Sequence, residues 1–238
     1  MQGQFACQAG HGTAKRRRVT PEAPDPLSPE AELALAWSGP KVRAPLSIAL
    51  QLDRRLARIV GRTQEPVLGQ MRLAWWREAL GKPVAGRPRG DAVLDGIGRL
   101  WHGREAFLVQ MVDGWEVLVT AESLGPAEAA VFGEGRGAFF AGLTDMPAEG
   151  ARAARLAAAG RRWALADAAA GVSDPAEAAV LAEAGRAVTA PAGRIPRPLA
   201  GLAVLEALAV RALARGGRPL MEGRGASLSA LRAAIFRA

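Results

Sequence analysis

The chain has 238 residues, half of them hydrophobic, and a formal net charge of +8. This length suits one domain with a large core or two small domains. Tyrosine is absent, and alanine and leucine dominate, a composition that favours helices. The single cysteine, Cys7, argues against a disulfide framework, and two distant histidines, His11 and His102, argue against a histidine zinc site or a Ser-His-Asp triad.

No apolar run of about 18 residues occurs, and no apolar segment follows the N-terminal charges. The sequence therefore predicts neither a membrane span nor a secretory signal. We expect a cytoplasmic protein with at most peripheral contact at the inner face of a membrane. The positive charge could serve nucleic acid, anionic lipid or phosphorylated ligands. However, its arginines are scattered through helical periods, as on solvated faces, so no specific nucleic-acid partner is predicted.

Residues 1–28 are predicted to form a disordered tail, because they are rich in proline and poor in apolar residues. The basic run at residues 15–18 would bind nucleic acid or anionic lipid, or it belongs to a solvated tail or to an extension from an upstream start site. Residues 29–238 are predicted to form one all-α domain.

Helical periodicity, proline at helix starts and glycine after helix ends define the expected helices in this domain. We expect helices at about residues 29–37, 45–60, 66–80, 91–102, 105–122, 126–143, 149–170, 175–186, 199–215 and 228–236. Glycines at residues 133, 135 and 137 lie inside one of them, where each costs ~1 kcal/mol relative to alanine. We therefore expect these glycines to permit close helix–helix contact or to line a cavity.

The segment at residues 64–80, QEPVLGQMRLAWWREAL, is the most distinctive part of the sequence. Its helix has a wide apolar face and a second, narrower face formed by Leu73, Trp76 and Leu80. The wide face contains Val67, Leu68, Met71, Ala74, Trp75 and Ala79. A helix that is apolar on two sides is expected to be buried between neighbours. Arg72 falls between the faces and Glu78 within the wide one, so both are expected to be buried and paired with charges on other helices.

This segment resembles a signature of the squalene/phytoene synthase family. Shorter stretches at residues 44–58, 113–118, 133–143 and 197–203 are similar to other segments of that family and occur in the same order. The resemblance covers roughly residues 30–215. It implies the isoprenoid synthase fold, an all-α bundle around a central cavity. Active members of the family condense two prenyl diphosphates head to head, a step of isoprenoid and carotenoid biosynthesis.

That chemistry requires magnesium ions to neutralise the diphosphates, and magnesium prefers oxygen ligands. Family synthases supply them from two DxxxD motifs on facing helices, where each pair of carboxylates shares one face. Here Asp53 is followed at i+4 by Ala57, and Asp167 by Gly171. The spacing recurs only at residues 91 and 95, which match neither family position. We therefore predict that the catalytic aspartates are lost.

Six side chains are candidates for lining the cavity or binding an anion: Asp53, Arg72, Trp76, Arg77, Arg136 and Asp167. Guanidinium groups match phosphate oxygens with two hydrogen bonds. The structural alternatives are that Arg72 pairs with a buried carboxylate, Asp53 or Glu78, and that Trp76 belongs to the core. No catalytic residue, metal ligand or cofactor is assigned.

Our interpretation is a squalene/phytoene synthase-like pseudoenzyme that resembles the complex I assembly-factor relatives of the family. It would have an assembly or interaction role and bind a protein client or a prenyl or lipid ligand. The alternative is an active prenyl transferase with atypical magnesium ligands. A weaker alternative is a binder of anionic lipid or nucleic acid, which would need clustered arginines.

Overall fold

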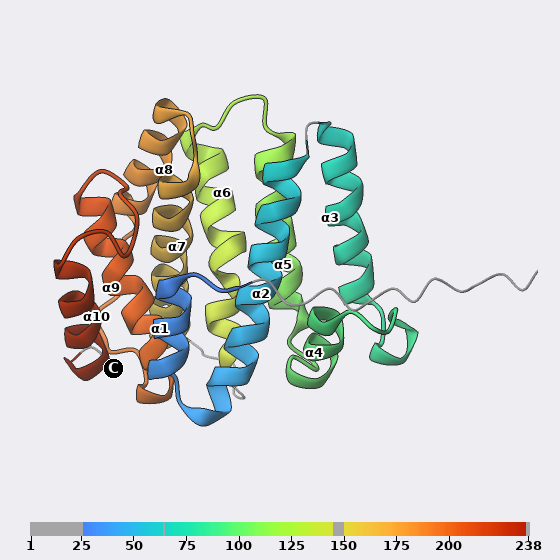
Figure 1. Ribbon diagram of the computed structural model, residues 1–238, viewed down its shortest axis with the longest axis horizontal. Coiled ribbons are helices and arrows are strands. Elements are labelled where there is room, and N and C mark those ends of the chain that lie inside the picture. The colour runs from blue at the N-terminus through green and yellow to red at the C-terminus, as the bar shows by residue number, and fades with distance from the viewer. Residues whose placement is uncertain (1–25, 64, 145–149, 237–238) are drawn as a thin grey trace, which may run out of the picture.

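The computed structural model describes residues 26–63, 65–144 and 150–236, and this part of the chain is all-α, with no strand (Figure 1). The predicted tail lies outside the described residues, apart from residues 26–28. The α-helices are α1 (Pro29–Trp37), α2 (Pro40–Arg62), α3 (Pro66–Gly81), α4 (Ala92–Leu100), α5 (Glu105–Thr120), α6 (Pro126–Gly137), α7 (Gly150–Gly171), α8 (Pro175–Ala187), α9 (Ala200–Ala214) and α10 (Gly225–Phe236). Short 3-10 helices lie at Val84–Gly86, Ala138–Leu143 and Arg197–Leu199.

The largest differences from the predicted helix bounds are in α2 and α6. Helix α2 begins at Pro40 and carries Pro45 inside it, where only a helix start was expected. The carbonyl of Pro45 accepts a hydrogen bond from the indole N–H of the buried Trp101 at 3.0 Å. The helix predicted at residues 126–143 ends at Gly137 and continues as a 3-10 helix. Asp91 and Asp174 cap α4 and α8 by accepting hydrogen bonds from backbone N–H groups.

The helices form a bundle in which α3 lies at one edge and α10 at the opposite edge (Figure 1). Helix α5 packs against α2, α3 and α6, and α7 packs against α6, α8 and α9. Helix α9 is buried along most of its length and also carries α1 and α10 on its sides. None of the described helices has the length and apolar character needed to cross a membrane.

The glycines of α6 allow its backbone to touch both neighbouring helices. A Cβ atom added to Gly135 would lie 2.8 Å from the Cα of Gly114 on α5. A Cβ added to Gly137 would lie only 2.4 Å from the carbonyl carbon of Gly160 on α7. No side chain fits at either position, so the prediction of close helix–helix contact is confirmed. These contacts hold α5, α6 and α7 at the spacing that the candidate site requires.

The prediction that α3 is buried on two sides is wrong. Its narrow face is buried, with Leu73, Trp76 and Leu80 almost fully covered. Its wide face is largely open to solvent, and Met71 is 64% exposed. The reason is the position of α3 at the edge of the bundle, where it contacts α5 and α2 on one side only.

The burial predicted for the two charged side chains of α3 is also wrong. Arg72 and Glu78 are both exposed. The carboxylate of Glu78 pairs with the ammonium group of Lys82, the residue directly after α3, at 2.6 Å. Both residues therefore belong to a solvated surface and are not buried charges that need partners on other helices.

Candidate functional site

The guanidinium group of Arg136 on α6 lies between two carboxylates, Asp53 on α2 and Asp167 on α7. Its Nε and Nη2 atoms each donate to one oxygen of Asp53, both at 2.8 Å. The Nη2 atom also donates to Oδ2 of Asp167 at 2.5 Å. The Nη1 atom donates to the carbonyl oxygen of Ala164 at 2.9 Å. We call Asp53, Arg136 and Asp167 the central triad.

The central triad is shielded from water on most sides. Arg136 is 2% exposed and Asp53 is 3% exposed, whereas the Asp167 side chain is 32% exposed. The guanidinium carbon lies 4.5 Å from the ring centroid of Trp163 and 4.8 Å from that of Trp115. Aromatic faces attract a cation at these distances, and more strongly when water is excluded.

Trp115 also donates its indole N–H to Oδ1 of Asp53 at 2.8 Å. Both oxygens of this buried carboxylate are therefore occupied. Burial by itself lowers the pKa of Arg136, but the Coulombic attraction of Asp53 and then of Asp167, with their hydrogen bonds, outweighs burial and raises that pKa. Arg136 is consequently a permanent cation, and the triad carries two formal negative charges against one positive charge.

The free space beside the central triad is small. A cavity of about 60 Å³ touches all three triad residues and is closed on one side by residues at the start of α1. One water molecule occupies ~30 Å³ in the liquid, so this space suits about two. Pockets that bind small organic ligands are larger, roughly 300–1,000 Å³. The cavity in this structure is too small for a prenyl diphosphate.

The residues at the triad do not fit a magnesium–diphosphate centre. Asp53 has both oxygens engaged by Arg136 and Trp115, and Asp167 has one oxygen engaged by Arg136. In the described part of the chain, no cluster of three or more acidic, histidine or cysteine residues could hold a metal ion. A metal ion would need free carboxylate oxygens here, and the guanidinium group of Arg136 already occupies them.

The one DxxxD spacing in the sequence, at residues 91 and 95, has a structural role. Asp91 accepts from the backbone N–H groups that open α4 and pairs with Arg55 of α2. Asp95 accepts from the backbone N–H of Gly90 at 3.1 Å. The two carboxylates thus order the turn before α4.

The remaining candidates lie on α3, away from the triad. Trp76 is a core residue that packs edge to face on Trp75, with ring centroids 5.2 Å apart. Arg77 joins α3 to α5 by pairing with Asp113 at 2.7 Å and with Glu116. Arg72 is exposed, as described above. Of the six candidates, the structure therefore brings together Asp53, Arg136 and Asp167.

A second buried charge network was missed by the sequence analysis. Glu206 on α9 is 1% exposed, and its carboxylate accepts two hydrogen bonds from Arg155 of α7, at 2.9 and 2.5 Å. Arg162 of α7 donates a third at 2.9 Å. The available signal was Glu206 itself, a single charge within the apolar run at residues 199–210. The network lies between two packed helices and links them.

Comparisons with protein-family models, with curated proteins and with solved structures find no match to this chain. The family resemblance therefore rests on the sequence segments described above. The chemistry of the site rests on the geometry of the central triad.

Proposed function

We propose that this protein has the isoprenoid synthase fold of the squalene/phytoene synthases and has exchanged their metal chemistry for an interaction role. The fold proposal is supported by the order of the family-like segments and by the all-α bundle. The observation that carries the functional proposal is the guanidinium group of Arg136, held between the carboxylates of Asp53 and Asp167.

The physical argument concerns countercharge. A diphosphate that leaves an allylic carbon needs metal ions that bind its oxygens directly. Each aspartate helix here keeps one carboxylate, and Arg136 supplies the positive charge between them. A guanidinium group donates hydrogen bonds but does not coordinate leaving-group oxygens as a metal does. With two carboxylates and one guanidinium, the triad keeps an excess of negative charge that repels a diphosphate.

The interaction role is supported by the open face of α3. Val67, Leu68, Met71 and Trp75 are 64%, 44%, 64% and 43% exposed. Their positions along the helix place them on one side, and α3 lies at the edge of the bundle (Figure 1). Methionine and aromatic residues are enriched at protein interfaces, and contiguous apolar patches mark them. We therefore assign this face to contact with a protein client.

The catalytic part of the proposal is tested by diphosphate release from farnesyl or geranylgeranyl diphosphate, with and without magnesium. We expect no magnesium-dependent release above a blank without protein. Release that requires magnesium and disappears in Asp53→Asn or Asp167→Asn would overturn the proposal. That result would restore the alternative, an active prenyl transferase with atypical metal ligands and Mg²⁺ as its cofactor.

The interaction part is tested by proximity labelling in cells with a Met71→Glu/Trp75→Glu variant. Val131→Glu on α6 is the control, because Val131 is also exposed, at 54%. We expect proteins labelled by wild type and control to be lost with the double variant. Identical labelling by all three proteins would contradict the client surface. So would a concentration-dependent dimer in light scattering that only the double variant abolishes, since the face would then join two copies.

A further inference from the structure

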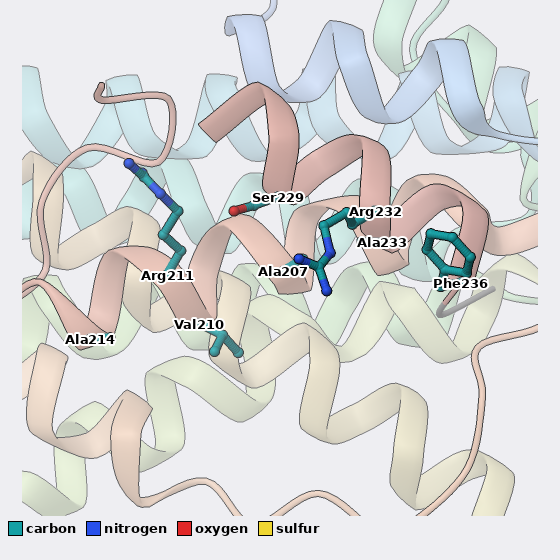
Figure 2. Close-up of a pocket in the computed structure, with 8 residues that line it drawn as sticks. All are labelled: Ala207, Val210, Arg211, Ala214, Ser229, Arg232, Ala233 and Phe236. Carbon is teal, nitrogen blue, oxygen red and sulfur yellow. The ribbon is translucent and has the colours of Figure 1, made fainter. Parts of the chain in front are cut away.

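A pocket of about 390 Å³ lies between α9 and α10, on the side of the bundle opposite α3 (Figures 1 and 2). It is lined by stripes of side chains at helical spacing on each helix. The residues that matter here are Val210, Arg211 and Ala214 of α9 and Ser229, Arg232 and Phe236 of α10. The pocket contains none of the residues of the central triad.

Arg211 lines one end of the pocket, and one N–H group of its side chain is unpaired among the described residues. The Nη1 atom of Arg211 is buried and has no hydrogen-bond partner among the described residues. Its guanidinium group lies against the first residue of α10, Gly225, where an added Cβ would lie 3.4 Å from Nε. A buried donor on a cation is costly when unpaired, and an anionic oxygen is its strongest partner. Arg232 adds a second positive charge from α10.

The nearby carboxylate of Glu222 is engaged by other arginines. It pairs with Arg218 at 2.5 Å and with Arg215 at 3.2 Å. The hydrogen bond from Arg218 is the main cause that lowers the pKa of Glu222, burial opposes it, and the charges of Arg218, Arg215 and Arg211 add to the lowering. Glu222 therefore contributes to the local electric field, but neither it nor any other described residue gives the buried Nη1 atom of Arg211 a hydrogen bond.

The rest of the pocket is apolar. Val210 and Phe236 remain 38% and 65% exposed although they are large hydrophobic side chains. Figure 2 shows Phe236 at the opposite end of the pocket from Arg211, with Val210 and Arg232 between them. A ligand that fits this arrangement has a charged end at Arg211 and an apolar body that extends toward Phe236.

We propose that the α9–α10 pocket binds a small anionic amphiphile, with a carboxylate or phosphate head at Arg211 and Arg232 and an alkyl chain along Val210 and Phe236. At ~30 Å³ for each water-sized group, the pocket holds a ligand of about a dozen non-hydrogen atoms. Its volume falls within the range of small-molecule sites, roughly 300–1,000 Å³. This inference is independent of the proposed function, because it uses neither the triad nor the face of α3.

The test is isothermal titration calorimetry of the full chain with decanoate, octyl phosphate and, as the uncharged analogue, decanol. We expect one site for decanoate or octyl phosphate, and the tighter of the two identifies the head group. Binding of decanol should be at least about tenfold weaker, which corresponds to about 1.4 kcal/mol. Arg211→Met and Arg232→Met should each weaken binding of the anion by a similar factor, whereas Arg72→Met, which removes an exposed arginine on α3, should leave it unchanged.

Two results would overturn the inference. One is equal binding of decanol and the anions, or equal weakening by all three arginine variants, since either would show nonspecific adsorption. The other is binding of the protein to phosphatidic acid vesicles without any binding of free decanoate or octyl phosphate, because the ligand would then be a charged membrane surface. Circular dichroism of each variant checks that the fold is intact, and the exposed Arg232 offers a variant with little effect on packing.

Discussion

Removing either Asp53 or Arg136 alone should lower the unfolding free energy strongly, because the other side chain then becomes a buried charge without its main partner. In Asp53→Leu, the guanidinium group keeps Ala164 and the half-buried Asp167 as hydrogen-bond partners among the described residues. In Arg136→Met, the buried carboxylate keeps one hydrogen bond from a described residue, that of the indole N–H of Trp115. Each single variant should lose ~3–5 kcal/mol of unfolding free energy, the range for one orphaned buried charge.

The double variant Asp53→Leu/Arg136→Met carries no orphaned charge at this pair. Replacing a buried ion pair by apolar side chains of similar size is often neutral or stabilising. We therefore expect the double variant to be at least as stable as either single variant, so the coupling energy should be at least ~3 kcal/mol, the smallest loss expected for one single variant. Urea unfolding followed by circular dichroism measures all four proteins, and the slope should not change.

The control is the same cycle on a surface pair, Arg77→Met with Asp113→Leu. These side chains are 38% and 49% exposed. Exposed pairs are worth ~0–1 kcal/mol, so this cycle should show little coupling. Effects at Asp53 and Arg136 that add to within ~0.5 kcal/mol would refute the reasoning, because they would mean that the two groups are solvated and independent.

Three further predictions concern packing, pH and the surface. Gly137→Ala should lower the unfolding free energy measured in urea by about 1–3 kcal/mol, because its Cβ would strike the Gly160 backbone. Gly171→Ala is the control, since Gly171 has open space around it, and it should change stability by less than about 0.5 kcal/mol. Equal effects of the two variants would contradict this packing. Burial raises the pKa of Glu105, but its hydrogen bonds and ion pair outweigh burial and lower that pKa. Its stabilising contribution is therefore present above the unfolded pKa of about 4.3 and lost as pH falls through the lower folded value, so unfolding free energy should fall less steeply with acidification in Glu105→Gln than in wild type. Arg72→Ala should change stability by no more than about 0.5 kcal/mol, and a large loss in thermal unfolding would restore a buried Arg72.

Local signals predicted the helices well. Proline at the first turn placed the starts of α3 and α8 where they occur. The glycines of α6 were identified as contact positions because glycine is costly inside a helix without a reason. These inferences succeed because each depends on a few neighbouring residues. The extra turn at the start of α2 was missed, because Pro45 was taken as a helix start although it lies inside the helix.

The buried face of α3 could not be predicted from periodicity. Both faces are apolar, and the wider one was expected to be covered along with the narrower one. Which face is covered depends on α5, where Val119 lies 3.1 Å from a Cβ placed on Gly69. Gly69 lets Val119 of α5 approach this side of α3. The number of apolar residues on each face does not show where such an approach is possible.

The sequence analysis named the three residues of the central triad as candidates, but it did not predict that they contact one another. Asp53, Arg136 and Asp167 were each identified as candidates, and the resemblance placed the two aspartates on facing helices. Arg136 lies 83 residues from Asp53 in the sequence, and no local pattern joins them. The close approach of α6 to α7, which the glycines permit, brings Arg136 to Asp167, and Asp53 reaches the same guanidinium group from α2.

The central claim is that Arg136 occupies the carboxylates that a synthase would offer to metal ions. Electron paramagnetic resonance of Mn²⁺, in the presence of inorganic diphosphate and the full chain, measures this directly. We predict that Mn²⁺ remains in its unbound form, or bound to diphosphate alone, at every protein concentration, and that Asp53→Asn leaves the spectrum unchanged. Stoichiometric binding of Mn²⁺ to the protein that is lost in Asp53→Asn or Asp167→Asn would contradict the claim and show that these carboxylates form a metal centre.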